Sequence, residues 1–170
     1  AYSGARVGEI AQLRAEDVMT VDGVHVLNIT PEAGSVKTGQ YRHVPLHPHL
    51  IEQGFLSVAT AKKTGPLFYD PEAATRKTAK ASKSLAEKVG QKIRDMVREA
   101  GIGPDQVEQP NHAWRHRFKT QARRWKLDTE AAHHMQGHAT DSEGQAYGSW
   151  PVERLAEEIA KLPRYKVPGL

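Results

Sequence analysis

From Leu85 onwards, apolar residues recur every three or four positions in several runs, and glycine or proline bounds most of these runs. This spacing places apolar side chains on one face of a helix. It predicts four helices, at about 85–100, 111–126, 129–135 and 152–162. The apolar stripe of the second helix is Trp114, Phe118, Ala122 and Trp125. A chain in which such runs dominate is expected to build its core mainly from packed helices.

The first third of the chain gives a different signal. A helix capped by Ser3 is expected to extend towards Asp17. The alternating, β-branched segment VHVLNI predicts a strand at 24–29, and SVKTGQYRHVPL predicts a β-hairpin that turns around Thr38-Gly39-Gln40. A further helix is expected to begin at Pro48 and to end at Gly65-Pro66.

These elements predict an α+β fold, mainly α-helical, with one small antiparallel sheet near the N-terminal third. The length of 170 residues suits a single domain, residues 1–170, around one hydrophobic core. Because the chain begins with Ala1 and a functional-looking arginine stands as early as position 6, we expect a fragment of a longer protein.

The composition of the chain excludes several kinds of site and of partner. The net charge of +4 and the pI near 9.3 are compatible with an anionic partner. The absence of cysteine excludes disulfides, zinc–thiolate sites and thiol nucleophiles. No apolar run is long enough to span a bilayer and no secretory signal is present, so we expect a cytoplasmic protein without a membrane partner.

Five short stretches contain side chains suited to chemistry on a phosphodiester. Two guanidiniums can bind phosphate oxygens, a lysine and imidazoles can transfer protons, and a phenol can attack phosphorus. No carboxylate cluster that would hold a metal accompanies them. The set predicts covalent phosphoryl transfer on a nucleic-acid backbone with no metal and no cofactor. Its members are Arg6 in SGARVGEI, Lys37 in VKTGQYRHVPL, His112 and Arg115 in HAWRHRF, His138 in QGHA, and Tyr147 in AYGSW.

Taken singly, each of these residues also has a purely structural explanation. Arg6 can form an ion pair with Glu9, which lies at i+3 on the same helical face. Tyr147 can pack against Trp150 as a surface aromatic, and an isolated HxxR fits the basic solvent face of a helix. Only the combination of these residues, and no single one of them, therefore indicates a catalytic site.

In this order, the five stretches resemble the catalytic domain of the tyrosine recombinases, the phage integrase family, from the first residues to about Trp150. The resemblance implies a catalytic role for each member of the set, with Tyr147 as the nucleophile, Lys37 on the hairpin as the general acid, and Glu9 as the usual acidic neighbour of Arg6. Gln136 departs from the pattern, since leucine often precedes the Gly-His pair.

The resemblance also implies a site-specific recombinase or integrase that cleaves and rejoins DNA through a 3′-phosphotyrosine, with a fold like that of type IB topoisomerases. The implied partners are double-stranded DNA and further copies of the chain, as a tetramer on DNA joined through the C-terminal segment. An N-terminal DNA-binding domain is expected to be missing from this fragment. The helix at 152–162 either docks on a neighbouring protomer or seals its own core.

Two other functions remain open from the sequence. The first is a metal-dependent hydrolase, because His112 and His116 lie at i, i+4 and His133, His134 or His138 would supply a third ligand. The flanking cations Arg115 and Arg117 disfavour a metal ion there. The second is a DNA-binding module of the same fold without enzymatic activity.

Overall fold

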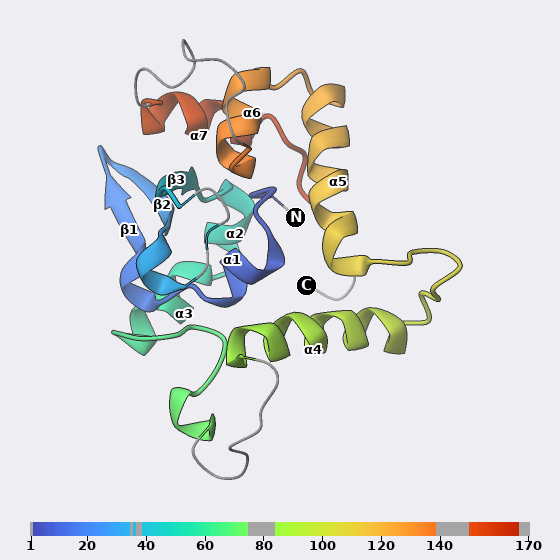
Figure 1. Ribbon diagram of the computed structural model, residues 1–170. Helices are drawn as coiled ribbons and strands as arrows, with labels where there is room; N and C mark the ends of the chain where they lie inside the picture. Colours follow the sequence, from blue (N-terminus) through green and yellow to red (C-terminus); the bar gives the residue numbers. More distant parts are fainter. Residues whose placement is uncertain (1, 35, 37–38, 75–83, 139–149, 167–170) are drawn as a thin grey trace.

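The computed structural model describes residues 2–34, 36, 39–74, 84–138 and 150–166 (Figure 1). Its strands are β1 (Val18–Val21), β2 (Val24–Ile29) and β3 (Arg42–Pro45). Its helices are α1 (Val7–Ala11), α2 (Pro48–Glu52), α3 (Phe55–Lys62), α4 (Leu85–Glu99), α5 (Pro110–Arg124), α6 (Thr129–Gln136) and α7 (Val152–Ala160). Short 3-10 turns lie at Ala15–Asp17, Pro31–Ala33 and Pro71–Ala74. A mainly helical α+β fold with a small antiparallel sheet is thus confirmed.

The sheet has the order β1-β2-β3, and both strand pairs are antiparallel. A two-residue turn, Asp22-Gly23, joins β1 to β2, and both residues have positive φ, as a type I′ hairpin turn requires. β3 pairs with β2, with Ile29 opposite Arg42. The predicted hairpin around Thr38-Gly39-Gln40 lies partly outside the described residues and stays a prediction. Lys37 lies outside the described residues.

Two predicted helices of the N-terminal third are shorter than expected. Ser3 does not cap α1; Arg6 occupies the N-cap position, and α1 ends at Ala11, before the 3-10 turn. The helix predicted from Pro48 to Gly65 is divided in two, because Gly54 adopts a left-handed conformation between α2 and α3. The four helices predicted after Leu85 are present, with ends within about two residues of those expected.

Helices α6 and α7 pack against β3, α5 packs against α6, and α4 packs against α1 and α5 (Figure 1). The core forms where these elements meet the sheet. Its largest fully buried apolar side chains include Leu13, Val26, Ile29, Val44, Phe118, Met135, Leu155 and Ile159. Because Leu155 and Ile159 belong to α7, the apolar face of the last helix is buried in this chain's own core. Among the helices of the described residues, none combines the length and apolarity needed to cross a bilayer.

The predicted apolar stripe of α5 is wrong at both ends. Trp114 and Trp125 are each 44% exposed, whereas Phe118 and Ala122 are buried. The inward face of α5 runs instead through Arg115, Phe118 and Ala122, which follow helical spacing. This rotation turns Arg115 towards the start of the chain and towards the end of α6, where the candidate site lies.

Candidate active site

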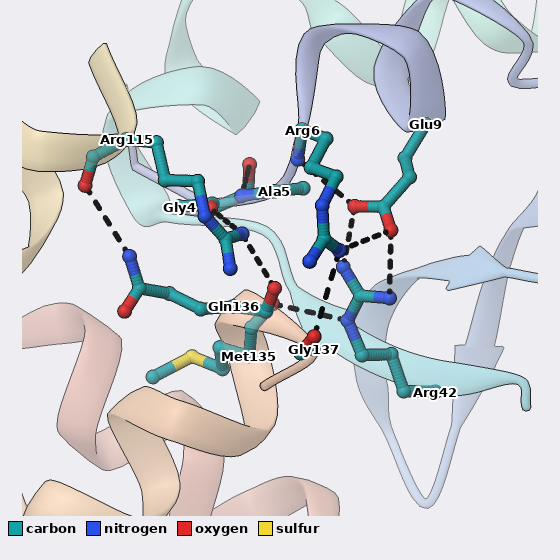
Figure 2. A network of polar contacts seen from close by, with 10 residues as sticks. Gly4, Ala5, Arg6, Glu9, Arg42, Arg115, Met135, Gln136 and Gly137 are labelled. Atoms are coloured by element: carbon teal, nitrogen blue, oxygen red, sulfur yellow. Dashed lines mark hydrogen bonds and ion pairs between the residues drawn. The ribbon is translucent and has the colours of Figure 1, made fainter. Parts of the chain in front are cut away.

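Four segments that are far apart in the sequence meet at one place: the stretch before α1, the start of β3, the middle of α5 and the end of α6 (Figure 2). The contacts are made by arginine side chains that donate to backbone carbonyls and to one carboxylate. Two of these arginines, Arg6 and Arg115, are among the predicted site residues. The third, Arg42, was not predicted.

Arg115 connects the start of the chain to the end of α6. Its Nη1 donates to the carbonyl oxygen of Gly4 at 2.7 Å and to that of Gln136 at 2.5 Å. Burial, followed by the charge of Arg6, lowers the pKa of Arg115 to about 10. The guanidinium is therefore charged at neutral pH. Since both carbonyls bond to Nη1, the contacts with these two oxygens leave the Nη2 edge of the fork to other partners.

Arg6 stands at the N-cap of α1. Its backbone N–H donates to Glu9 Oε2 at 2.9 Å, and its Nη1 donates to Glu9 Oε1 at 3.1 Å and to Gly137 O at 3.5 Å. The structural explanation from the sequence, an ion pair at i+3, is thus present. About a third of the Arg6 side chain is exposed, so the ion pair does not remove this guanidinium from solvent.

A pocket of about 480 Å³ opens beside these residues. Arg6, His112 and Arg115 line it together, as do Arg94 and Glu108. The first turn of α5, which begins with Pro110 at its first helical position, forms another wall. The dipole of a helix makes its N-terminus partly positive, so this wall favours an anion. Three of the predicted residues therefore share one cationic pocket.

His138 is positioned by the end of α6. Gly137 takes a left-handed conformation, and the N–H of His138 then donates to His133 O at 3.1 Å, a common helix termination. Burial, then the nearby charge of Arg115, lowers the pKa of His138 to about 4. At neutral pH this imidazole is neutral, so it offers an N–H donor and no positive charge.

Lys37 and Tyr147, the remaining two predicted residues, lie outside the described residues. Their places in the site stay predictions. Of the six predicted residues, the structure therefore describes Arg6, His112 and Arg115 around one pocket, with His138 next to Gly137, whose carbonyl accepts from Arg6.

The histidines do not form the cluster that the metal-dependent alternative requires. His112 contacts His116 edge-on, with ring centroids 4.5 Å apart, and His133 lies 5.1 Å from His138. These are two separate pairs. Over the described ranges, no group of three or more histidine, aspartate or glutamate side chains is arranged to hold a metal ion.

Arg42 is the site residue that sequence reasoning missed. Its side chain is 5% exposed, and it donates from Nη2 to Glu9 Oε2 at 2.7 Å and from Nε to Met135 O at 3.1 Å (Figure 2). A local signal was present, because the period of two along a strand places Arg42 on the same face as the buried Val44. A charged residue on the inward face of a strand needs a buried partner.

Gln136 explains how the departure before the Gly-His pair is accommodated. Its side chain is 1% exposed, and its Nε2 donates to the backbone oxygen of Arg115 at 3.2 Å. The backbone carbonyl of Gln136 accepts from Arg115 Nη1. Within the part of the chain that the structure describes, no group donates to Gln136 Oε1. The amide thus gains one hydrogen bond and leaves one buried oxygen without a donor.

We expect a Gln136→Leu variant to be as stable as the wild type or more so, within about 1 kcal/mol. The change removes one neutral hydrogen bond, worth about 0.5–1.5 kcal/mol, and also removes an unsatisfied buried oxygen, which costs about 1–3 kcal/mol. Urea unfolding followed by circular dichroism measures the difference. Gln136→Ala is the matched control, and the cavity it leaves should cost at least about 2 kcal/mol. A comparable loss in the leucine variant would contradict this account.

Comparison with known proteins identifies the domain. The profile of the phage integrase family matches residues 1–150, which is most of the 170-residue chain. A search of curated proteins gave no match, and a search of solved structures gave none either. Members of the matched family are DNA-binding recombinases that act in DNA integration. This chain carries a tyrosine recombinase catalytic domain and belongs to the phage integrase family.

Proposed function

We propose that this domain is a site-specific DNA strand-transferase that cleaves and rejoins DNA through a 3′-phosphotyrosine at Tyr147. The observation that supports it best is the convergence of Arg6, His112 and Arg115 on one pocket, from two segments far apart in the sequence. Two guanidiniums and a helix N-terminus facing the same space suit a phosphate with two non-bridging oxygens.

Charge stabilisation is the main task assigned to the arginines. Attack on phosphorus produces a pentavalent phosphorane, whose non-bridging oxygens gain negative charge. Arg6 and Arg115 would donate to those oxygens, and His138 would add a neutral N–H donor because its pKa of about 4 keeps it uncharged. Donors already held by the fold need no reorganisation during the reaction, which is why such groups usually contribute most.

Proton transfer completes the proposed reaction. A tyrosine phenol in water has a pKa of about 10, so the proton of Tyr147 must leave as its oxygen attacks. His112, which lines the pocket, is assigned as the acceptor. The bond from phosphorus to the 5′ oxygen breaks at the same time, and Lys37 is assigned as the donor that protonates this leaving oxygen.

The covalent intermediate retains the energy of the phosphodiester bond, so rejoining needs neither ATP nor a metal. If the 5′ hydroxyl of a second strand attacks, the product is recombinant; if the original strand returns, the DNA is restored with its strain relaxed. This chemistry links the domain to type IB topoisomerases, and we include a similar fold in the proposal. Assembly as a tetramer on double-stranded DNA belongs to the same proposal.

The test is covalent trapping on DNA whose target sequence is left open. A pool of duplexes with a randomised centre and a nick in one strand is incubated with the protein. Because of the nick, cleavage releases a short piece of DNA, and its loss prevents rejoining. We expect a denaturation-resistant complex whose phosphopeptide maps to Tyr147 and whose yield is unchanged by a chelator. DNA binding with no covalent complex would support the non-enzymatic alternative. Cleavage that a chelator abolishes would support the hydrolase.

A further inference from the structure

One buried carboxylate is shared by two arginines. The Glu9 side chain is 2% exposed, and its Oε1 accepts from Arg6 at 3.1 Å while its Oε2 accepts from Arg42 at 2.7 Å (Figure 2). Arg42 also reaches Oε1 from Nη1 at 3.4 Å, so its guanidinium faces the carboxylate with both terminal nitrogens. The geometry of Glu9 is therefore set from the side of β3 as well as from its own helix.

Arg42 is held at its other edge by the end of α6. Its Nε donates to Met135 O at 3.1 Å, two residues before Gly137. A Cβ added at Gly137 would lie 2.6 Å from the Cζ of Arg42, closer than Cβ atoms approach other heavy atoms. Gly137 therefore leaves the space that the Arg42 guanidinium occupies, and its carbonyl is the second acceptor for Arg6.

The two arginines differ in what they face. Arg6 lines the cationic pocket, and about a third of its side chain is exposed. Arg42 is 5% exposed and does not appear among the residues that line this pocket. Arg42 contacts both structures that hold Arg6, namely the Glu9 carboxylate and the turn at the end of α6, so it can act on Arg6 through them.

We propose that Arg42 is a positioning residue that fixes the Glu9 carboxylate and, through it, orients the Arg6 guanidinium for phosphate binding. The proposal rests on the proposed strand-transfer function, in which Arg6 touches the reacting phosphate. Arg42 itself touches no reacting atom. It supplies the second positive charge that keeps a buried carboxylate ionised while Arg6 remains available to the substrate.

The charges around Glu9 give this role a measurable signature. Burial alone would raise the pKa of Glu9, but the hydrogen bond and charge of Arg42, followed by those of Arg6, hold it below its ordinary value. Without Arg42, the burial effect is opposed by Arg6 alone, so the pKa of Glu9 rises. Below that raised pKa, Glu9 is neutral and no longer attracts Arg6.

Other ionisable groups near this network must be considered in a pH experiment. Arg115 on α5 and Arg42 on β3 interact electrostatically with Glu9 and with each other. His134 on α6 and its neighbour His43 on β3 lie near Arg42, and burial lowers the pKa of His134. His138 lies near Arg6. A control that removes only the Glu9 titration is therefore required.

The experiment compares initial rates of covalent complex formation between about pH 5 and 8. We expect Arg42→Met, which keeps an unbranched side chain without charge, to be about 10–100-fold slower than wild type, as for loss of a supporting residue. Its rate should fall further as pH decreases, whereas the wild type shows no such loss from Glu9. Arg42→Lys keeps the charge but cannot hold both partners, so it should recover part of the rate.

Two matched variants separate positioning from general destabilisation. Arg42→Met combined with Glu9→Gln has no carboxylate to titrate, so it should stay slow but lose the added acid sensitivity. Arg14→Met removes a similar partner from the buried carboxylate of Asp17, which Arg14 contacts at 2.7 and 2.9 Å. Arg14 does not line the cationic pocket. This variant should lose stability and keep the wild-type pH profile.

A measurement without DNA distinguishes failure of this proposal from failure of the proposed function. Carbon-13 NMR titration of the Glu9 carboxyl, assigned with Glu9→Gln, should show a higher pKa in Arg42→Met, or in the equally uncharged Arg42→Gln if the methionine variant does not fold. An unchanged pKa, or a pH profile shared by Arg42→Met and Arg14→Met, would overturn the positioning role. A raised pKa of Glu9, together with no covalent complex from the wild type, would support the coupling between Arg42 and Glu9 and contradict the strand-transfer function.

Discussion

Replacing Tyr147 with phenylalanine is expected to abolish the denaturation-resistant complex with nicked DNA while leaving the protein folded. The change removes one oxygen and keeps the aromatic ring, so loss of the covalent complex would show that this oxygen forms the bond to DNA. Because no other atom of the side chain can form the phosphoester, we expect no detectable covalent complex rather than a slower reaction. The measurement is gel separation after denaturation, with filter binding to show that DNA is still bound.

The other tyrosines supply the control for this prediction. Tyr41 is 69% exposed and follows the segment that carries Lys37, so Tyr41→Phe is the matched variant and should form the complex at the wild-type rate. Tyr2 is unsuited to attack DNA, since its hydroxyl is buried and bonded to His49 Nδ1 at 2.7 Å and to the N–H of Tyr165 at 2.9 Å. A complex that persists in Tyr147→Phe and disappears in Tyr41→Phe would assign the nucleophile elsewhere.

The helices of the second half could be predicted because their signals are local. In α4, α6 and α7, apolar spacing gives the type of each helix, while Gly137 marks the end of α6 and Pro151 the start of α7. The direction in which α5 faces could not be obtained in this way. Two tryptophans dominate its apolar spacing, yet the neighbouring segments meet the side that carries Phe118, and the tryptophans remain at the surface.

The sheet shows where local signals were overlooked and where they do not exist. Asp22-Gly23 is a strong hairpin signal, and it would have predicted β1. The partner of β3 is a different case. β2 offers the buried Leu27 opposite Val44, and a strand pairs where both faces match the core, so this pairing depends on residues outside the β3 segment.

In the candidate site too, some features follow from local sequence and others depend on distant segments. The order of Arg6, His112, Arg115 and His138 identifies residues whose type suits the chemistry, and the structure describes them close together. The supporting contacts depend on atoms from distant segments. The residues near Arg42 in the sequence do not indicate that its partner is Glu9. Those near Gln136 do not indicate that its amide donates to the backbone of Arg115.

Truncation of Arg115 to alanine is expected to slow strand cleavage by about 10²–10³-fold, the usual effect of losing one donor to a developing oxyanion. The fold should also be weakened, because Gly4 O and Gln136 O both lose the Nη1 donor, and an unsatisfied buried carbonyl costs about 1–3 kcal/mol. Single-turnover cleavage at saturating DNA measures the first effect, and urea unfolding measures the second.

Two further variants keep these effects apart. Arg115→Lys retains a positive charge but lacks the planar fork, so it cannot hold the two backbone carbonyls and also donate to phosphate along a second edge. If charge alone matters, lysine restores cleavage; if the fork matters, as the contacts of Nη1 indicate, cleavage stays slow. Arg124→Ala removes an exposed cation from the same helix and should leave the rate at saturating DNA unchanged. Cleavage by Arg115→Ala at the wild-type rate would mean that this guanidinium serves the fold and contributes nothing to the reaction.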